Sequence, residues 1–210
     1  MKERQDNSRE GYLLVITGKA GAGKDAVLGK LFEAIEDLEQ IVTYATRDPR
    51  ADEVHGVHYN FANEQEFLEM VERDEFLEQV KYGKTYKGTH KNSILGVLEG
   101  KKVVWRIDIS RAATVEETFR ERFPEDIHTS LLERTIVVLL DLPDSETAKK
   151  RVIERDGDGY DEEEFVLRHT QDSEVLSKYT FQHTVVNHQG KLEETVSNVI
   201  KINEERLGGR

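Results

Sequence analysis

The residues with the clearest chemical meaning lie near the start of the chain, in the stretch GKAGAGKDAV at residues 18–27. Its glycines allow backbone N–H groups to curl around phosphate oxygens, because side chains at these places would collide with them. A lysine adds positive charge, and a helix that begins there presents the positive end of its dipole. The spacing G-x-x-x-x-G-K predicts a nucleotide-phosphate site made of Gly18, Lys19, Ala20, Gly21, Ala22, Gly23, Lys24 and Asp25.

Asp25 departs from this pattern, which has Ser or Thr after the lysine to hold a magnesium ion through its hydroxyl. Two hypotheses stay open for it. In the first, the Asp25 carboxylate contacts Mg²⁺ directly or through water, because carboxylates are hard oxygen ligands. In the second, Asp25 pairs with Arg106 near the phosphates, and its contribution is to stability.

A second cluster follows in the stretch TRDPRADEVHGVHYNF, residues 46–61. Arg47 and Arg50 are three apart, and paired guanidinium groups bind a dianionic phosphate through bidentate forks. Tyr59 adds a phenolic donor. The alternative interpretation is a set of surface ion pairs with the acidic neighbours Asp48, Asp52 and Glu53.

Apolar runs and helical repeats alternate along the chain, which is typical of an α/β fold. Tyr12–Thr17 is a nearly continuous apolar run, as expected for a parallel strand buried on both faces. Four further segments of this kind predict strands: Ile41–Tyr44, Lys102–Ile107, Thr135–Leu140 and His183–Val186. Amphipathic repeats predict helices over Lys24–Leu38, Glu64–Arg73, Lys91–Glu99, Val115–Phe123, Ser145–Arg155, Glu162–Ser177 and Leu192–Glu205. Between Thr46 and Thr89 short aromatic-rich pieces with glycines indicate an inserted subdomain.

Composition narrows the class of protein. The chain has 210 residues, of which 37% are hydrophobic and 34% charged, as expected for a well-solvated globular domain. A net charge of -12 argues against general nucleic-acid binding, which needs a basic face. No window approaches the ~18 apolar residues of a membrane span, and the first ten residues lack the apolar core of a secretory signal, so we expect neither. The absence of cysteine excludes disulfides and is compatible with a reducing cytoplasm.

The motifs in their order resemble the guanylate kinase family. After the glycine loop comes T-R-x-P-R-x-x-E-x-x-G-x-x-Y-x-F at residues 46–61, then FLE at 76–78 and YKGT at 86–89. A predicted strand ends near Asp108, and Arg155 and Arg168 match the family's lid arginines. The resemblance covers about residues 11–205, and its middle signature is highly specific. It implies a P-loop kinase that phosphorylates GMP with ATP and Mg²⁺, by in-line transfer without a covalent intermediate.

The resemblance also implies roles for single residues. Lys24, Arg47, Arg155 and Arg168 would surround the charge that develops on the transferred phosphoryl group, and Asn187 would lie near the adenine of ATP. A carboxylate suits the N1–H and 2-amino donors of guanine, and a hydroxyl can donate to its O6 acceptor. The implied guanine readers are Thr43, Glu78, Thr89 and Asp108. The implied binders of the GMP phosphate are Arg47, Arg50, Tyr59 and Lys87.

Four departures from the family leave alternatives open. Besides Asp25, Arg106 stands where the family has an acidic residue, Lys87 replaces a phosphate-binding tyrosine, and Ser110-Arg111 replaces glutamine–glycine. Some of these features are similar to ribose 1,5-bisphosphate phosphokinases, so a kinase of that sugar phosphate or of another nucleotide is the first alternative. A catalytically silent guanylate-kinase-like interaction domain is the second.

The expected architecture is an α/β fold with a P-loop-type parallel sheet flanked by helices, an inserted GMP-binding subdomain and a helical lid. The core would comprise residues 11–42, 90–150 and 170–207, the GMP-binding subdomain 43–89 and the lid 151–169. The expected substrates are GMP and ATP, with dGMP left open as an acceptor. We expect no nucleic-acid or membrane partner, a cytoplasmic location, and a monomer or a homodimer.

Overall fold

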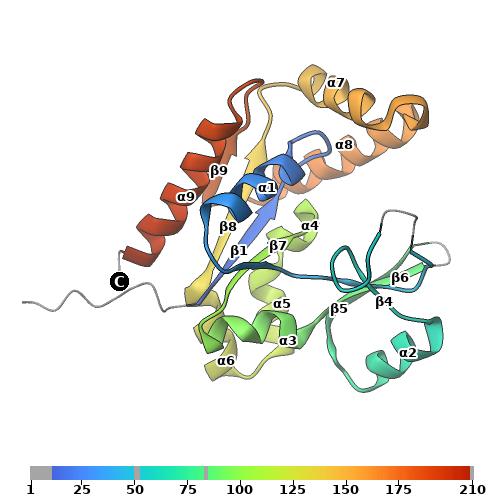
Figure 1. The fold of residues 1–210 in the computed structure, drawn as a ribbon, viewed down its shortest axis with the longest axis vertical. Coiled ribbons are helices and arrows are strands. Elements are labelled where there is room, and N and C mark those ends of the chain that lie inside the picture. The colour runs from blue at the N-terminus through green and yellow to red at the C-terminus, as the bar shows by residue number, and fades with distance from the viewer. Residues whose placement is uncertain (1–10, 50–52, 83–84, 209–210) are drawn as a thin grey trace, which may run out of the picture.

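The centre of the molecule is a parallel sheet. The computed structural model of the chain describes residues 11–49, 53–82 and 85–208. Its five-stranded sheet has the order β2-β7-β1-β8-β9 and runs through the upper part of the molecule in Figure 1. The strands are β1 (Tyr12–Thr17), β2 (Leu38–Gln40), β7 (Lys102–Arg106), β8 (Thr135–Asp141) and β9 (His183–Val186). The predicted α/β fold with a parallel sheet flanked by helices is therefore confirmed.

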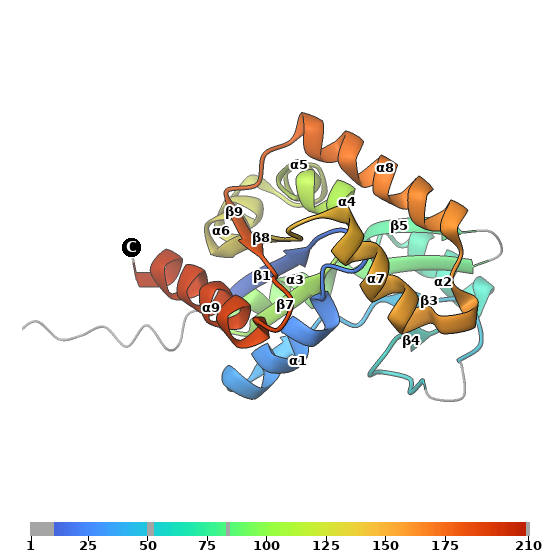
Figure 2. The same cartoon turned by 90° about the horizontal axis from the view of Figure 1, so that it is seen from above.

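Helices cover both faces of this sheet, as Figure 2 shows for α1 and α9 on one side and α5 and α6 on the other. Every residue of β1 is buried, and successive side chains point to opposite faces. Leu14 and Ile16 pack with α1 and α9, whereas Leu13 and Val15 pack with residues of α3, α5 and α6. The helices of this part are α1 (Lys24–Ala34), α3 (Lys91–Leu95), α4 (Ile109–Ala113), α5 (Val115–Arg122), α6 (Glu125–Arg134) and α9 (Leu192–Gly208).

The stretch with many aromatic residues forms a second, smaller sheet that lies beside the core in Figure 1. Its strand order is β4-β3-β6-β5, and α2 (Glu64–Glu72) covers it. Phe67 of α2 stacks on Phe76 with ring centroids 4.4 Å apart and on Tyr86 at 5.5 Å. The aromatic residues therefore form a separate small core. The strands are β3 (Tyr44–Ala45), β4 (Asn60–Phe61), β5 (Phe76–Tyr82) and β6 (Thr85–His90).

Two long helices, α7 (Ser145–Asp156) and α8 (Glu162–Lys178), meet at one end in a turn and together connect β8 to β9. The short turn between them contains a 3₁₀ segment at Gly157–Gly159. Asp161 caps α8 by accepting a hydrogen bond from the Glu164 backbone N–H at 3.0 Å. The acidic first turn of α8 favours this helix start, because negative charge there is stabilised by the helix dipole. Within the described residues, no helix is long and apolar enough to cross a membrane.

The structure corrects the sequence prediction at one strand and two helices. The helix predicted over Lys91–Glu99 is α-helical as far as Leu95 and continues as a 3₁₀ helix over Gly96–Glu99. The helix α1 ends at Ala34 instead of Leu38, and the second strand is Leu38–Gln40 instead of Ile41–Tyr44. The helix ends because its C-cap residue Ile35 has an extended backbone, with φ of -114° and ψ of 109°. Asp37, with a φ of 61°, then turns the chain into β2. Ile41 still donates its backbone N–H to Val104 O at 2.9 Å, and its side chain is buried in the core, which explains why the residue is apolar.

Two short helices, α4 and α6, were missing from the prediction. Asp108 caps α4 by accepting from the Arg111 backbone N–H at 3.0 Å. Pro124 precedes α6, which opens with two acidic residues. A capping aspartate, and a proline followed by acidic residues, are signals of a helix start. The two helices were not predicted because neither segment has a long amphipathic repeat.

Candidate active site

The predicted phosphate loop connects β1 to α1 at the carboxyl edge of the sheet. Gly18 has a φ of 150°, and a Cβ at this place would lie 2.2 Å from Leu140 O. Gly23 has a φ of 84° and precedes α1. Lys24 Nζ donates to Gly18 O at 2.6 Å and to Lys19 O at 3.1 Å, so the loop curls over its own lysine. This is the geometry expected of a loop that presents backbone N–H groups and an ammonium group to an anion.

The ammonium group of Lys24 lies in a buried and electropositive environment. The pKa of Lys24 is lowered to about 8, first by burial and then by the positive charge of Arg106, whereas Asp172 and Asp25 act in the opposite direction. An anionic ligand near Lys24 would stabilise the charged ammonium form, because a nearby opposite charge favours the charged state of a group. The electrostatics of the loop therefore suit a phosphate.

Asn187, predicted near adenine, lies behind the loop and is 4% exposed. Its Nδ2 donates to Ala22 O at 2.8 Å, and its Oδ1 accepts from Thr195 Oγ1 at 3.1 Å. Arg151 of α7 adds contacts from Nη2 to Asn187 O at 3.0 Å and from Nη1 to Gly21 O at 3.3 Å. The Asn187 side chain is thus used to support the loop backbone.

A further support comes from α8. His169 Nε2 lies 3.2 Å from Ala20 O, and Lys19 Nζ donates to Ser173 Oγ at 2.8 Å. Half-buried Asp172 lies close enough to Lys24 for their charges to interact. The sequence analysis missed these α8 residues and Arg151, because nothing in the helical repeat marks which side chains reach another element.

Asp25 and Arg106 form an ion pair across the carboxyl edge of the sheet. Arg106 is the last residue of β7, and Asp25 lies in the first turn of α1. Their side chains are 38% and 73% exposed. Of the two hypotheses for Asp25, the pairing with Arg106 is present in the structure. Within the described residues, no group of three or more His, Cys, Asp or Glu side chains is arranged to hold a metal.

The predicted phosphate binders of the insertion lie together, except for Arg50, which is outside the described residues. Arg47 makes a bidentate ion pair with Glu53, with both N···O distances 2.6 Å, and this contact raises the pKa of Arg47. The Arg47 guanidinium also lies 5.2 Å from the Tyr59 ring centroid, and Lys87 Nζ lies 5.1 Å from it on the same insertion. A cation pair around one phenol is thus assembled where the signature predicts phosphate binding.

The predicted guanine readers also gather in one place. Thr89 Oγ1 donates to Glu78 Oε1 at 2.7 Å. Arg111 Nη1 lies 3.1 Å from Glu78 Oε2, and its Nε lies 3.4 Å from Asp108 Oδ2. We refer to Glu78, Thr89, Asp108 and Arg111 as the acceptor cluster. Thr43 directly precedes β3, in which Tyr44 pairs with Gly88, the neighbour of Thr89 in β6.

The predicted lid arginines lie on α7 and α8 and are mostly exposed. Arg155 pairs with Asp156, with N···O distances of 2.7 and 2.9 Å. Arg168 pairs with Glu164, one turn earlier on α8. Among the described residues neither arginine makes a hydrogen bond or an ion pair with the phosphate loop, although Arg155 lies close enough to Lys24 and Asp25 for their charges to interact. The part of both arginines in catalysis stays a prediction.

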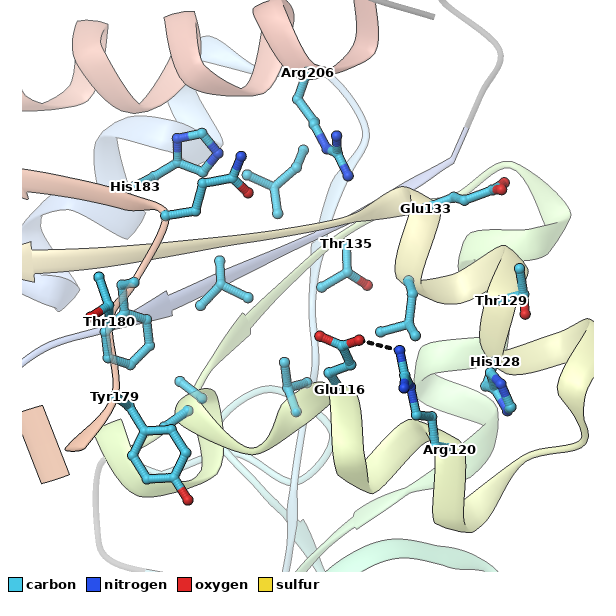
Figure 3. A pocket seen from close by; sticks show the side chains of 18 residues that line it. Glu116, Arg120, His128, Thr129, Glu133, Thr135, Tyr179, Thr180, His183 and Arg206 are labelled. Atoms are coloured by element: carbon cyan, nitrogen blue, oxygen red, sulfur yellow. Dashed lines mark hydrogen bonds and ion pairs between the residues drawn. The ribbon is translucent and has the colours of Figure 1, made fainter.

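A hollow of about 520 Å³ lies elsewhere, at the amino ends of β8 and β9 (Figure 3). Thr135 and His183 mark these strand ends, and an ion pair between Glu116 and Arg120 lies on its α5 wall. The phosphate loop follows the carboxyl end of β1, so the hollow is at the opposite end of the sheet. Ligands of open parallel sheets bind at the carboxyl ends of the strands, which favours the loop and the acceptor cluster as the site.

Comparisons with known proteins point to one family. The family model described as guanylate kinase matches residues 10–206. A guanylate kinase from Caldanaerobacter subterraneus subsp. tengcongensis is 37% identical over 177 residues, which are 82% of this chain and 79% of that protein. Guanylate kinase 2, chloroplastic/mitochondrial, from Oryza sativa subsp. japonica is 36% identical over 191 residues, 90% of this chain and 62% of that protein. A crystal structure of guanylate kinase from Anaplasma phagocytophilum shares the fold, with a TM-score of 0.62, 19% identity, and coverage of 92% of this chain and 85% of that one.

Proposed function

The chain belongs to the guanylate kinase family, and we propose that it transfers the γ-phosphoryl group of ATP to GMP at the carboxyl edge of its parallel sheet. The observation that carries the proposal is the pairing of β1 with β7, in which Ile16 lies beside Arg106. Because of this register, the phosphate loop after β1 and Asp108 after β7 meet at one edge. A donor site and an acceptor site are thus neighbours, as a direct transfer requires. No finding favours the sugar-phosphate kinase or the silent interaction domain.

We propose that the donor nucleotide binds along Gly18, Lys19, Ala20, Gly21, Ala22, Gly23, Lys24 and Asp25. The backbone N–H groups of the loop and the start of α1 would bind the phosphates, and Lys24 would neutralise charge on them. Asn187 would act by holding the loop backbone in place. The support for this assignment is the conformation of the loop and the buried ammonium group.

The acceptor would bind on the insertion and at the end of β7. Glu78 would accept hydrogen bonds from N1–H and the 2-amino group of guanine, while Thr43, Thr89 and Asp108 complete the base site. Adenine presents an acceptor at N1, so a buried carboxylate there would lose its partner at a cost of about 1–3 kcal/mol. The acceptor phosphate would bind Arg47, Arg50, Tyr59 and Lys87.

The chemistry of transfer depends on charge and alignment. The transition state spreads negative charge over the equatorial phosphoryl oxygens. Lys24 and Arg47 would stabilise this charge from the loop and from the insertion, and Arg155 and Arg168 would add to it once the α7–α8 pair moves in. We accordingly propose the division into core (11–42, 90–150, 170–207), GMP-binding subdomain (43–89) and lid (151–169).

Asp25 fits the role of a magnesium ligand. Kinases bind Mg²⁺ through one or two carboxylates together with substrate phosphates, so a single acidic side chain beside the loop is a sufficient protein contribution. Asp25 is 73% exposed and uses Oδ1 in its pair with Arg106. When bound, the ion would neutralise charge on the β- and γ-phosphates. The absence of cysteine is compatible with a cytoplasmic location, which we propose together with a monomeric or homodimeric state.

A coupled assay of ADP release tests the proposal. The purified chain is incubated with ATP and Mg²⁺ and with GMP, dGMP, AMP, UMP or ribose 1,5-bisphosphate. We expect turnover with GMP, none above background with AMP, and loss of turnover in Lys24→Met. Lys30→Ala, which removes a half-buried lysine of the same helix that pairs with Glu33 and Glu193, is the matched control and should keep the rate. No turnover with GMP at millimolar concentration would refute the proposed function.

A further inference from the structure

The two carboxylates of the acceptor cluster share one guanidinium group, that of Arg111. Its Nη1 lies 3.1 Å from Glu78 Oε2 and its Nε 3.4 Å from Asp108 Oδ2. The backbone N–H of Arg111 also donates to Asp108 Oδ1 at 3.0 Å, so the capped start of α4 positions the residue. The side chain is 28% exposed. Arg111 is therefore held in place by two separate contacts with Asp108.

The Glu78 carboxylate next to it is buried and only partly satisfied. Its side chain is 16% exposed, and burial raises the pKa of Glu78, whereas the charge of Arg111 and the hydrogen bond from Thr89 lower it. Oε1 accepts from Thr89, but buried Oε2 accepts no hydrogen bond from any described residue, although Arg111 lies near it. An acceptor atom is thus available beside a guanidinium group that favours its ionised form.

A carboxylate and a guanidinium group side by side complement the base edge of guanine. The N1–H and 2-amino donors of guanine suit the carboxylate, and its neighbouring O6 and N7 acceptors suit the planar fork of an arginine. Arginine carries five N–H donors, so its two contacts in the cluster leave donors available. Adenine presents a 6-amino donor where guanine has O6, and a guanidinium group there would face another donor.

We propose that Arg111 is a specificity-determining residue of the acceptor site, which donates to O6 and N7 of the guanine base while Glu78 accepts from N1–H and the 2-amino group. This inference rests on the proposed function, since it names a further contact of the same acceptor. It assigns adjacent edges of one base to two side chains whose nearest atoms, Arg111 Nη1 and Glu78 Oε2, lie 3.1 Å apart. The assignment makes separate predictions for changes at each edge of the base.

Steady-state kinetics with base analogues test it on the full chain. The acceptors are GMP, 7-deaza-GMP, which lacks the N7 acceptor, and IMP, which lacks the 2-amino group. For the unchanged protein we expect kcat/KM to fall about fivefold or more from GMP to 7-deaza-GMP. In Arg111→Ala this penalty should fall below about twofold, while the IMP penalty stays as it was. The variant should lose about fivefold to a hundredfold in kcat/KM for GMP, with KM for ATP unchanged.

Two further variants sharpen the result. Arg111→Lys keeps the charge beside Glu78 but lacks the planar fork, so it should lose the 7-deaza-GMP penalty and keep the IMP penalty. It also carries the test if thermal unfolding shows that Arg111→Ala is misfolded. Arg120→Ala, on the wall of the distant hollow, is the control and should match the unchanged protein throughout.

Equal 7-deaza-GMP penalties in the unchanged protein and in both Arg111 variants would overturn the inference. So would an Arg111→Lys variant that keeps the full penalty, because the fork would then not be the recognising group. These outcomes are distinct from a failure of the proposed function, in which the unchanged protein does not phosphorylate GMP at all.

Discussion

Asn187 offers a sharp test of how the phosphate loop is held. Its amide makes two hydrogen bonds, from Nδ2 to Ala22 O at 2.8 Å and from Thr195 Oγ1 to Oδ1 at 3.1 Å. Asn187→Ala removes both from a site that is 4% exposed. A buried hydrogen bond contributes about 1 kcal/mol, and an unsatisfied partner costs about 1–3 kcal/mol. Because Thr195 Oγ1 also donates to Lys191 O at 3.1 Å, only the Ala22 carbonyl loses this support outright.

We therefore expect Asn187→Ala to lower the free energy of unfolding by about 2–3 kcal/mol. For a chain of this size the midpoint of thermal unfolding should fall by about 4–12 °C. Thr195→Val removes one of the two contacts and should cost about half as much. His188→Ala is the matched control, because this exposed neighbour should leave the midpoint unchanged.

Kinetic measurements can distinguish two roles of Asn187, support of the phosphate-loop backbone and contact with the adenine base. If Asn187 holds the loop backbone, Asn187→Ala should raise KM for ATP, leave KM for GMP unchanged, and leave the ratio of kcat/KM for ATP and GTP as donors unchanged. A contact with adenine would instead change that ratio. Unfolding of the nucleotide-free variant at the original midpoint, together with a changed donor ratio, would refute the reasoning.

Three further changes test the acceptor cluster, the Asp25 carboxylate and the loop. Glu78→Gln should lower kcat/KM for GMP yet raise the stability near neutral pH. The folded-state pKa of Glu78 is raised by burial, so the stability that Glu78 contributes is lost as pH rises through that pKa. In urea titrations from about pH 4 to pH 7, the free energy of unfolding of Glu78→Gln relative to the unchanged protein should therefore increase. A decrease over this range would contradict the raised pKa. Asp25→Asn should hardly change thermal unfolding, because exposed ion pairs contribute little to stability. It should, however, raise the Mg²⁺ concentration needed for half-maximal rate. Lower stability with an unchanged Mg²⁺ requirement would mean that Asp25 only pairs with Arg106. Gly23→Ala should lower the free energy of unfolding in urea by about 1–3 kcal/mol. Gly23 has a φ of 84°, and a Cβ there would lie 2.4 Å from Asn187 Nδ2. A variant as stable as the unchanged protein would show that this strain is absent.

The sequence predicted those parts of the fold that depend on periodicity or on local chemistry. The burial of β1 follows from its apolar run, and the phosphate loop follows from glycine spacing before a helix start. The strand register could not be predicted, because pairing of Ile16 with Arg106 depends on the packing of whole elements. The same limit applies to single side chains. Arg151 and Arg111 reach their partners across more than 30 residues of chain, and no local pattern marks such contacts.

Two arginines of the candidate site, Arg47 and Arg106, each pair with a carboxylate, and the two ion pairs differ in how exposed they are to solvent. Arg47 and Glu53 are mostly buried, with side chains 23% and 11% exposed. Separating a buried pair is costly, because one charge is left uncompensated. Arg47 has further donors, so a phosphate can bind it while Glu53 stays in place and fixes its orientation. The pair of Arg106 with Asp25 is far more exposed and contributes little. In the proposed complex, phosphate would therefore replace Asp25 beside Arg106, and Mg²⁺ would replace Arg106 beside Asp25, at small cost. We therefore expect the less exposed Arg47–Glu53 pair to orient Arg47 for the proposed acceptor, and the exposed Asp25–Arg106 pair to be the one that exchanges its partners when the donor nucleotide binds.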